Sequence, residues 1–192
     1  MTIAPAETKG SSSPQPSAGA LCLNLGGLGE GFRDGSVPGF KTVDLRPGAD
    51  YQCDASDLSI FKDSTVSEIY ASNILEHFSL NRTVDVLKEW RRVLVKGGKL
   101  WLSVPDFDAC VRLYLKRGLV PWVQYLIWGD QKHELNYHYI NFTWASLSHL
   151  LYQAGYSDFK RLDNLPYGVQ DASVLIDTVE GKPISLNVEA TR

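Results

Sequence analysis

The sequence has few cysteines and no long apolar run. Its three cysteines, Cys22, Cys53 and Cys110, lie far apart along 192 residues, so they form none of the closely spaced pairs that metal sites and redox motifs use. No stretch approaches the roughly 18 to 20 apolar residues that span a bilayer, and no apolar signal core follows basic residues at the N-terminus. We therefore expect reduced thiols, a cytoplasmic location and no membrane partner.

An excess of positive charge is also missing. The chain has 19 Lys and Arg against 22 Asp and Glu, a formal net charge of −3, so no large positive field attracts a phosphate backbone. We therefore expect no nucleic-acid partner. Hydrophobic residues, in contrast, make up 44% of the chain, which suffices for the packed core of one globular domain.

Composition divides the chain into two parts. Residues 1–19 are mainly Ser, Pro, Ala and Gly, a mixture that cannot offset the entropy lost on ordering. We expect a disordered leader over residues 1–19 and a single domain over residues 20–192.

Short apolar runs alternate with helical patterns from residue 21 onward, as in parallel strands joined by crossovers. Strands are expected at residues 21–25, 41–45, 66–71, 99–104, 159–162, 173–179 and 184–189. Helices are expected at residues 82–95, 107–116, 121–128 and 142–154. Lys96-Gly97-Gly98 is expected to end the first helix, and the last two strands have the spacing of an antiparallel hairpin. The pattern predicts an α/β fold.

Glycines follow the first predicted strand, in Leu23-Asn24-Leu25-Gly26-Gly27-Leu28-Gly29-Glu30-Gly31. Glycine lets the backbone turn sharply and approach a ligand, although such a loop also serves as a simple turn. Asp44 follows Gly26 by about 18 residues, close to the roughly 20 expected for a carboxylate that binds ribose hydroxyls. Together these features predict a nucleotide or nucleoside site.

Three later segments narrow the choice of cofactor. Cys53-Asp54-Ala55-Ser56-Asp57-Leu58, Ser67-Glu68-Ile69-Tyr70-Ala71-Ser72-Asn73-Ile74-Leu75-Glu76-His77 and Arg91-Arg92-Val93-Leu94-Val95-Lys96-Gly97-Gly98-Lys99-Leu100 occur in that order. With the glycine loop they resemble the class I S-adenosylmethionine-dependent methyltransferases, from residue 21 to about residue 106. The resemblance implies S-adenosyl-L-methionine as cofactor and a Rossmann-like fold, in which a mostly parallel sheet with an antiparallel C-terminal strand forms the middle of a three-layer sandwich.

The resemblance also implies which residues contact the cofactor. They are Gly26, Gly27 and Gly29 at the methionine portion, Asp44 at the ribose hydroxyls, Asp54 with Ala55 at the adenine edge, and Leu45 and Asn73 beside them. Two departures from the family pattern stand out. Gly27, Gly29 and Gly31 form the better-spaced glycine set, and the path from Leu25 to Phe40 is too short for a long crossover helix.

Several of these side chains have a second interpretation. Asp54 is also suited to capping its own loop. Arg46, beside Asp44, either binds a 2′-phosphate or points to solvent. The aromatic side chains Trp122, Tyr125, Trp128 and Tyr137 either form an acceptor pocket or, at helical spacing, belong to the core.

Two histidines are the candidate catalytic residues. Methyl transfer is a displacement at a sulfonium carbon, which mainly requires an aligned acceptor, and a general base assists when the acceptor is a hydroxyl. His77 ends the segment that the family places at the methyl group, and His138 lies in Asn136-Tyr137-His138-Tyr139-Ile140-Asn141. We expect His138 to be the base, whereas His77 either takes part in catalysis, as a base or by positioning the reactants, or is a packing residue. The sequence indicates no metal site.

The predicted function is methyl transfer from S-adenosylmethionine to a small-molecule or glycan acceptor, at oxygen. One alternative is a non-catalytic methyltransferase-like binding or interaction protein, which the irregular glycine loop favours. Another is an NAD(P)-dependent oxidoreductase, which explains the glycines and Asp44 but not the later segments.

Overall fold

The computed structural model describes residues 4–5, 19–29, 35–177 and 181–192. Most of the predicted leader and Gly31 of the glycine loop lie outside these ranges. Within the leader, Ala4–Pro5 form the short strand β1, which pairs antiparallel with Leu175 and Ile176. Across the described ranges, no helix is both long enough and apolar enough to cross a membrane.

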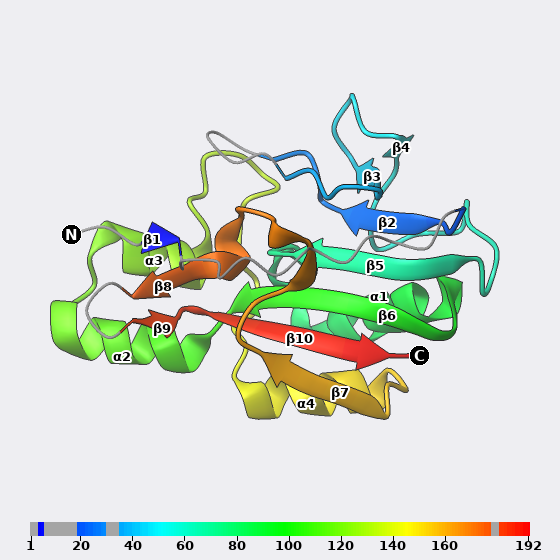
Figure 1. Ribbon diagram of the computed structural model, residues 1–192. Coiled ribbons are helices and arrows are strands. Elements are labelled where there is room, and N and C mark those ends of the chain that lie inside the picture. The colour runs from blue at the N-terminus through cyan, green and yellow to red at the C-terminus, as the bar shows by residue number, and fades with distance from the viewer. Residues whose placement is uncertain (1–3, 6–18, 30–34, 178–180) are drawn as a thin grey trace.

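The centre of the molecule is a seven-stranded sheet with the order β4-β3-β2-β5-β6-β10-β7 (Figure 1). Its strands are β2 (Cys22–Leu25), β3 (Lys41–Asp44), β4 (Tyr51–Gln52), β5 (Val66–Ser72), β6 (Leu94–Pro105), β7 (Asp158–Leu162) and β10 (Ser185–Thr191). The strands from β4 to β6 are parallel, whereas β10 runs antiparallel to both β6 and β7. The predicted mostly parallel sheet with an antiparallel C-terminal strand is confirmed.

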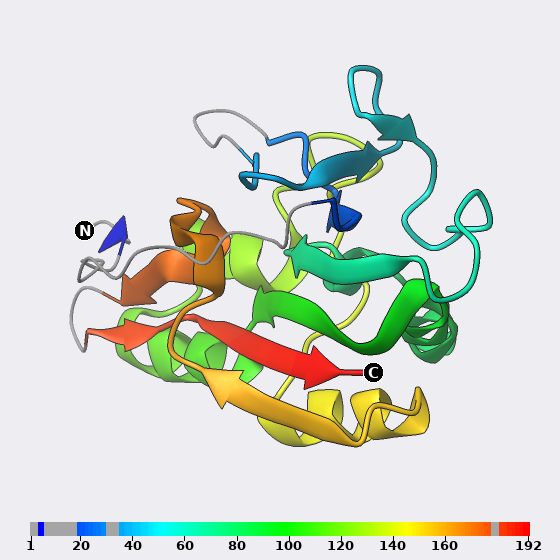
Figure 2. The same ribbon diagram turned by 45° about the vertical axis from the view of Figure 1, so that its right-hand side comes forward.

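Alternate residues of the central strands face opposite layers. On one face, helices α1 (Leu80–Val93) and α4 (Trp144–Gln153) cover a continuous apolar surface that includes Leu23, Ile69 and Leu100 (Figure 2). The other face carries a smaller cluster around Tyr70. The chain between β7 and β8 (Leu175–Asp177) covers it with the short 3-10 helices η2 (Pro166–Gly168) and η3 (Ala172–Val174) (Figure 1). The expected third layer is therefore built here from turns and 3-10 helices.

Three helices match their predicted positions closely. They are α2 (Phe107–Arg117), α3 (Pro121–Trp128) and α4. The side chain of Asp106 accepts a hydrogen bond from the Asp108 amide at the start of α2, as expected of a helix cap. Gly155, with φ +92°, follows α4 and allows the chain to turn.

The end of α1 was predicted incorrectly. The helix ends at Val93, and β6 begins at Leu94, so Lys96-Gly97-Gly98 lies within the strand segment and not at a helix terminus. Gly98 explains the change, because a Cβ there would lie 2.9 Å from the carbonyl oxygen of Ser67 on β5. The lack of a side chain at Gly98 lets the two backbones approach.

The C-terminal hairpin was predicted with the wrong second strand. β8 (Leu175–Asp177) pairs antiparallel with the two-residue strand β9 (Lys182–Pro183), in a small sheet with the order β1-β8-β9. β10 instead joins the central sheet. Sequence spacing correctly indicates a turn near Gly181, but burial in the central sheet decides where the final strand pairs.

A charged group links three strands of this sheet and provides a stability prediction. Glu189 on β10 lies 2.7 Å from Nζ of Lys99 and 2.9 Å from Nζ of Lys160. Partial burial raises the pKa of Glu189, but the hydrogen bonds from both lysines outweigh this effect and lower it below 4.5. A carboxyl group with a lowered folded-state pKa stabilises the fold above its unfolded pKa, and this contribution is lost as the pH falls.

Unfolding of a Glu189→Gln variant should therefore depend less on pH than that of the parent. At neutral pH we expect the variant to be less stable by about 1 kcal/mol, because one lysine is largely exposed. The difference should shrink as the pH falls below about 4.5. Urea unfolding at several pH values measures it, and a constant difference between pH 7 and pH 3 would show that the ion pairs contribute no pH-dependent stability.

Candidate functional site

The predicted cofactor residues lie at the carboxyl ends of neighbouring parallel strands. Gly26 follows β2, Asp44 ends β3, Asp54 follows β4 and Asn73 follows β5. Strands β2, β3, β4 and β5 are adjacent in the sheet, so these positions share one edge. This edge is where ligands bind in open α/β sheets.

The glycine loop is held close to the sheet by its own strand. Gly26 has φ +67° and donates its amide to the carbonyl of Val43 at 2.8 Å, a conformation that disfavours any larger residue. Asn24 extends from β2 and donates through Nδ2 to the carbonyl of Gly35 at 2.7 Å. A Cβ on Gly35 would lie 2.9 Å from the amide nitrogen of Gly29. The loop is therefore a compact turn with closely packed backbone.

Asp44 lies directly against this loop. Its side chain is 7% exposed, and its Oδ2 accepts the amide of Leu28 at 3.3 Å. Arg46 donates to the carboxylate through Nε at 3.0 Å and Nη2 at 2.9 Å, and also contacts the carbonyl of Leu28. Burial raises the pKa of Asp44, but the hydrogen bonds from Arg46 outweigh it and lower the pKa overall. Arg46 thus binds the predicted ribose carboxylate itself, which neither interpretation from the sequence anticipated.

The segment after β4 forms a self-capped turn. Oδ1 of Asp54 accepts the amide of Ser56 at 2.8 Å, the capping role weighed as its second interpretation. Ala55 is buried, and its carbonyl accepts Nε1 of Trp90 from α1 at 2.7 Å. The amide of Cys53 donates to the carbonyl of Asp44 at 3.1 Å. The turn is therefore held next to the end of β3, beside the exposed side chain of Leu45.

Beyond β5 the chain enters the 3-10 helix η1 (Leu75–His77) through Asn73. Asn73 has φ +52°, which asparagine tolerates better than most residues. Its Nδ2 donates to Oε1 of Glu76 at 3.0 Å. Glu76 is fully buried, its Oε2 has no hydrogen-bond partner in the described structure, and burial raises its pKa to about 8. Asn73 therefore positions a buried carboxyl group.

The two candidate histidines are neighbours in space. The amide of Tyr139 donates to the carbonyl of Glu76 at 2.8 Å, which fixes the segment between α3 and α4 beside the end of β5 (Figure 1 and Figure 2). The imidazole rings of His77 and His138 pack edge to face with centroids 4.9 Å apart. Burial and the proximity of His77 lower the pKa of His138 to about 4. The structure thus brings together residues about sixty positions apart in the sequence.

Both histidines are oriented by backbone carbonyls. Nδ1 of His77 lies 3.1 Å from the carbonyl oxygen of Tyr137, and Nδ1 of His138 lies 3.1 Å from that of Leu126. A carbonyl oxygen can only accept, so Nδ1 carries the proton in each ring. The lone pair of each neutral imidazole is therefore on Nε2.

The aromatic side chains around this site are largely exposed. Tyr125, Trp128 and Tyr137 are exposed, as is Tyr139, whereas α3 packs through the fully buried Val123. The interpretation of the aromatic set as core is therefore wrong for Tyr125, Trp128 and Tyr137. The helix is short and apolar on most sides, so spacing alone does not identify its buried face.

Sequence reasoning missed Glu76. It lies between Leu75 and His77 in a segment that was interpreted through its histidine, and only the fold shows that the carboxyl group is buried. The available signal was an acid directly beside a candidate catalytic residue.

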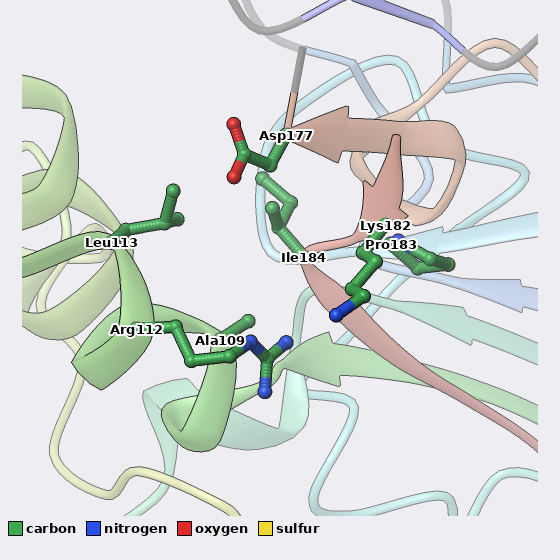
Figure 3. A pocket seen from close by; sticks show the side chains of 7 residues that line it. All are labelled: Ala109, Arg112, Leu113, Asp177, Lys182, Pro183 and Ile184. Carbon is green, nitrogen blue, oxygen red and sulfur yellow. The ribbon is translucent and has the colours of Figure 1, made fainter. Parts of the chain in front are cut away.

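Two cavities elsewhere in the described structure contain none of these residues. One, of about 10 Å³, lies between α2 and β9, where Arg112 and Lys182 extend toward each other (Figure 3). The other, of about 240 Å³, is lined by residues of 163–164, 173–176, Gly181 and Pro183. Neither is lined by the residues that directly follow β2, β3, β4 and β5.

Part of the chain matches a known protein family. Residues 40–102 match a family described as a methyltransferase domain. No curated protein sequence matches the chain at a significant level.

Solved structures share the fold at low sequence identity. A SAM-dependent methyltransferase from Archaeoglobus fulgidus is 12% identical, with 91% of this chain and 87% of that chain covered and a TM-score of 0.57. A possible histamine N-methyltransferase from Thermotoga maritima is 19% identical, with 89% and 81% covered and a TM-score of 0.55. An N1-methyltransferase from Burkholderia thailandensis, solved with S-adenosylhomocysteine, is 16% identical, with 90% and 71% covered and a TM-score of 0.51. A carbon methyltransferase also shares the fold.

Proposed function

We propose that this chain is a class I S-adenosylmethionine-dependent methyltransferase, and that it methylates an oxygen atom of a small-molecule or glycan acceptor. The matched segment and the shared fold support the first part of this proposal. The observation that supports this most is the position of Glu76, His77 and His138 beside the predicted cofactor edge. S-adenosylmethionine binds along that edge, and the acceptor approaches from the segment between α3 and α4.

The cofactor is proposed to lie across the ends of β2, β3, β4 and β5. Gly26, Gly27 and Gly29 contact the methionine portion, and the carboxylate of Asp44 accepts hydrogen bonds from the ribose hydroxyls. Leu45 and the Asp54-Ala55 turn lie beside Asp44 and flank the adenine ring. Asn73 lies at the end of β5, so the methyl group of the cofactor is proposed to lie at this end of the site.

Methyl transfer then requires an acceptor oxygen in line with the sulfonium. The acceptor hydroxyl gives its proton to Nε2 of His138, and its oxygen forms a bond to the methyl carbon. The carbon–sulfur bond breaks, and its electron pair remains on sulfur, which becomes a neutral thioether. His77 positions the reactants at the same place.

Oxygen is proposed because a hydroxyl must lose its proton before or during attack, whereas a neutral amine can attack directly. Two imidazole lone pairs suit that requirement. The exposed Tyr125, Trp128, Tyr137 and Tyr139 offer flat surfaces suited to a ring-containing acceptor. A screen that compares sugar, phenolic and small-metabolite hydroxyls with matched amines tests this assignment. Its readout is the release of S-adenosylhomocysteine. Activity on amines alone would refute it.

Calorimetric titration distinguishes the three functional hypotheses. We expect binding of S-adenosylmethionine and S-adenosylhomocysteine and no binding of NADPH. Binding of NADPH alone would support the oxidoreductase. Binding of the two sulfur compounds without turnover of any acceptor would favour the non-catalytic protein, and binding of none would remove the cofactor assignment.

Replacing Asp44 by alanine should weaken S-adenosylmethionine binding by about 1 to 3 kcal/mol, because buried ribose hydroxyls lose a charged acceptor. The fold should survive, since Arg46 is one-third exposed and can turn to solvent. Asp50→Ala is a matched control, because Asp50 forms an exposed ion pair with Lys41 at the other end of β3. Equal cofactor affinity in Asp44→Ala and Asp50→Ala would disprove the ribose assignment.

A further inference from the structure

Three ionisable side chains from two segments of the chain converge beside the end of β5. Glu76 and His77 belong to η1, whereas His138 comes from the segment between α3 and α4. One potential ligand atom from each residue lies within 4.8 Å of the other two. The backbone bond from Tyr139 to Glu76 and the bond from the His138 amide to the Trp128 carbonyl at 3.1 Å hold the two segments in place.

Glu76 is the unusual member of this group. It is 0% exposed, and Asn73 satisfies only Oε1. Oε2 has no hydrogen-bond donor among the described residues. A buried polar atom without a partner is costly and uncommon in native proteins. A cation or a proton at this oxygen would offset that cost.

The histidines are oriented as metal ligands are. Each Nδ1 donates to a backbone carbonyl, of Tyr137 for His77 and of Leu126 for His138. In metal sites the ring nitrogen that does not bind the metal commonly donates to such a carbonyl, which fixes the tautomer and the ring direction. Nε2 is then the coordinating atom.

We propose that Glu76, His77 and His138 bind one divalent transition-metal ion at the acceptor end of the site. Two imidazole nitrogens and one carboxylate oxygen are a ligand set that suits Zn²⁺ or Fe²⁺, whereas Mg²⁺ and Ca²⁺ prefer oxygen ligands alone. Three protein ligands leave a coordination position open.

The catalytic role of this metal ion rests on the proposed function. An acceptor hydroxyl at the open position would be held beside the methyl group and would lose its proton more readily, because a bound cation stabilises the oxyanion. The proton then passes to solvent, and His138 acts as a ligand in place of a base. Metal binding itself does not depend on that consequence.

The test uses untagged protein treated with a chelator and then titrated with Zn²⁺ in a calorimeter and with Co²⁺ in an absorption spectrometer. We expect one ion per chain and a Co²⁺ spectrum without thiolate charge-transfer bands, because the site contains no cysteine. Glu76→Gln and His138→Ala should each weaken binding by about 100-fold or more, since even residues supporting a ligand change affinity by about 10- to 100-fold. His133→Ala, in the same segment, should bind as the parent does.

Binding of S-adenosylmethionine is measured on the same samples without metal. Retained cofactor affinity and an unchanged circular dichroism spectrum in Glu76→Gln show that the variant is folded. The metal site is refuted if the parent binds no stoichiometric ion, or if Glu76→Gln and His138→Ala bind the ion as tightly as the parent does. Glu76 then carries a proton. If the parent binds metal but not S-adenosylmethionine, the metal site stands and the proposed function fails.

Discussion

Replacing His138 by alanine is expected to lower the rate of methyl transfer by about 10² to 10⁴-fold while S-adenosylmethionine affinity stays within a few-fold of the parent. The reason is that Nε2 of His138 acts on the acceptor in the transition state, whether it takes a proton or holds an ion. His138 contacts the carbonyl oxygens of Leu126 and Trp128, which lie in α3 and not on the cofactor strands. Single-turnover kinetics with saturating cofactor measure the chemical step.

Two other variants make this result specific. His133→Ala should retain parental rates, because His133 is an exposed residue of the same segment. His77→Ala should change rate and cofactor affinity together, since His77 lies in η1 directly after the cofactor strand β5. Full activity of His138→Ala on the true acceptor would remove His138 from the mechanism.

The largest effect on stability is expected at Trp90. Its side chain is fully buried against the sheet within the main core, and Nε1 donates to the carbonyl of Ala55. Trp90→Ala should lower the free energy of unfolding by about 3 to 5 kcal/mol, through lost apolar burial and the cavity that remains. Denaturant unfolding followed by circular dichroism measures it.

Trp90→Phe separates packing from positioning. Phenylalanine keeps most of the apolar contact but leaves the buried carbonyl of Ala55 without its donor, at a cost of about 1 to 3 kcal/mol. Because Ala55 lies in the predicted adenine turn, this variant should also bind S-adenosylmethionine more weakly than the parent at temperatures where it is fully folded. A loss below about 1 kcal/mol in Trp90→Ala would contradict the packing described for α1.

Local patterns predicted the elements well where one physical signal dominates. The run that became β2 was correctly placed, because a strand buried on both faces is apolar almost throughout. The start of α2 was also correct, since an aspartate cap is a local hydrogen bond. The end of α1 was wrong, because Gly98 lies in β6 against the backbone of Ser67, a strand contact that sequence spacing does not reveal.

Side-chain partners were harder to predict than elements. Asp44 was singled out correctly as a buried acid at a strand end, but its pairing with Arg46 depends on how the chain turns after β3. The exposure of Tyr125 and Trp128 depends on which side of α3 meets Ile184 and the neighbouring core. The first contact depends on the path of the chain after β3, and the second joins residues distant in the sequence, so no local pattern encodes either.

The sequence by itself determined the alternation of strands and helices, the glycine turn after β2 and the acids that follow successive strands, because each rests on the properties of neighbouring residues. Only the tertiary structure decided that Glu76 is buried with one oxygen lacking a donor among the described residues, and that His138 lies against His77. Burial and proximity are properties of the packed chain. The close approach of η1 and the α3–α4 segment arises from backbone hydrogen bonds across about sixty residues, such as that from Tyr139 to Glu76.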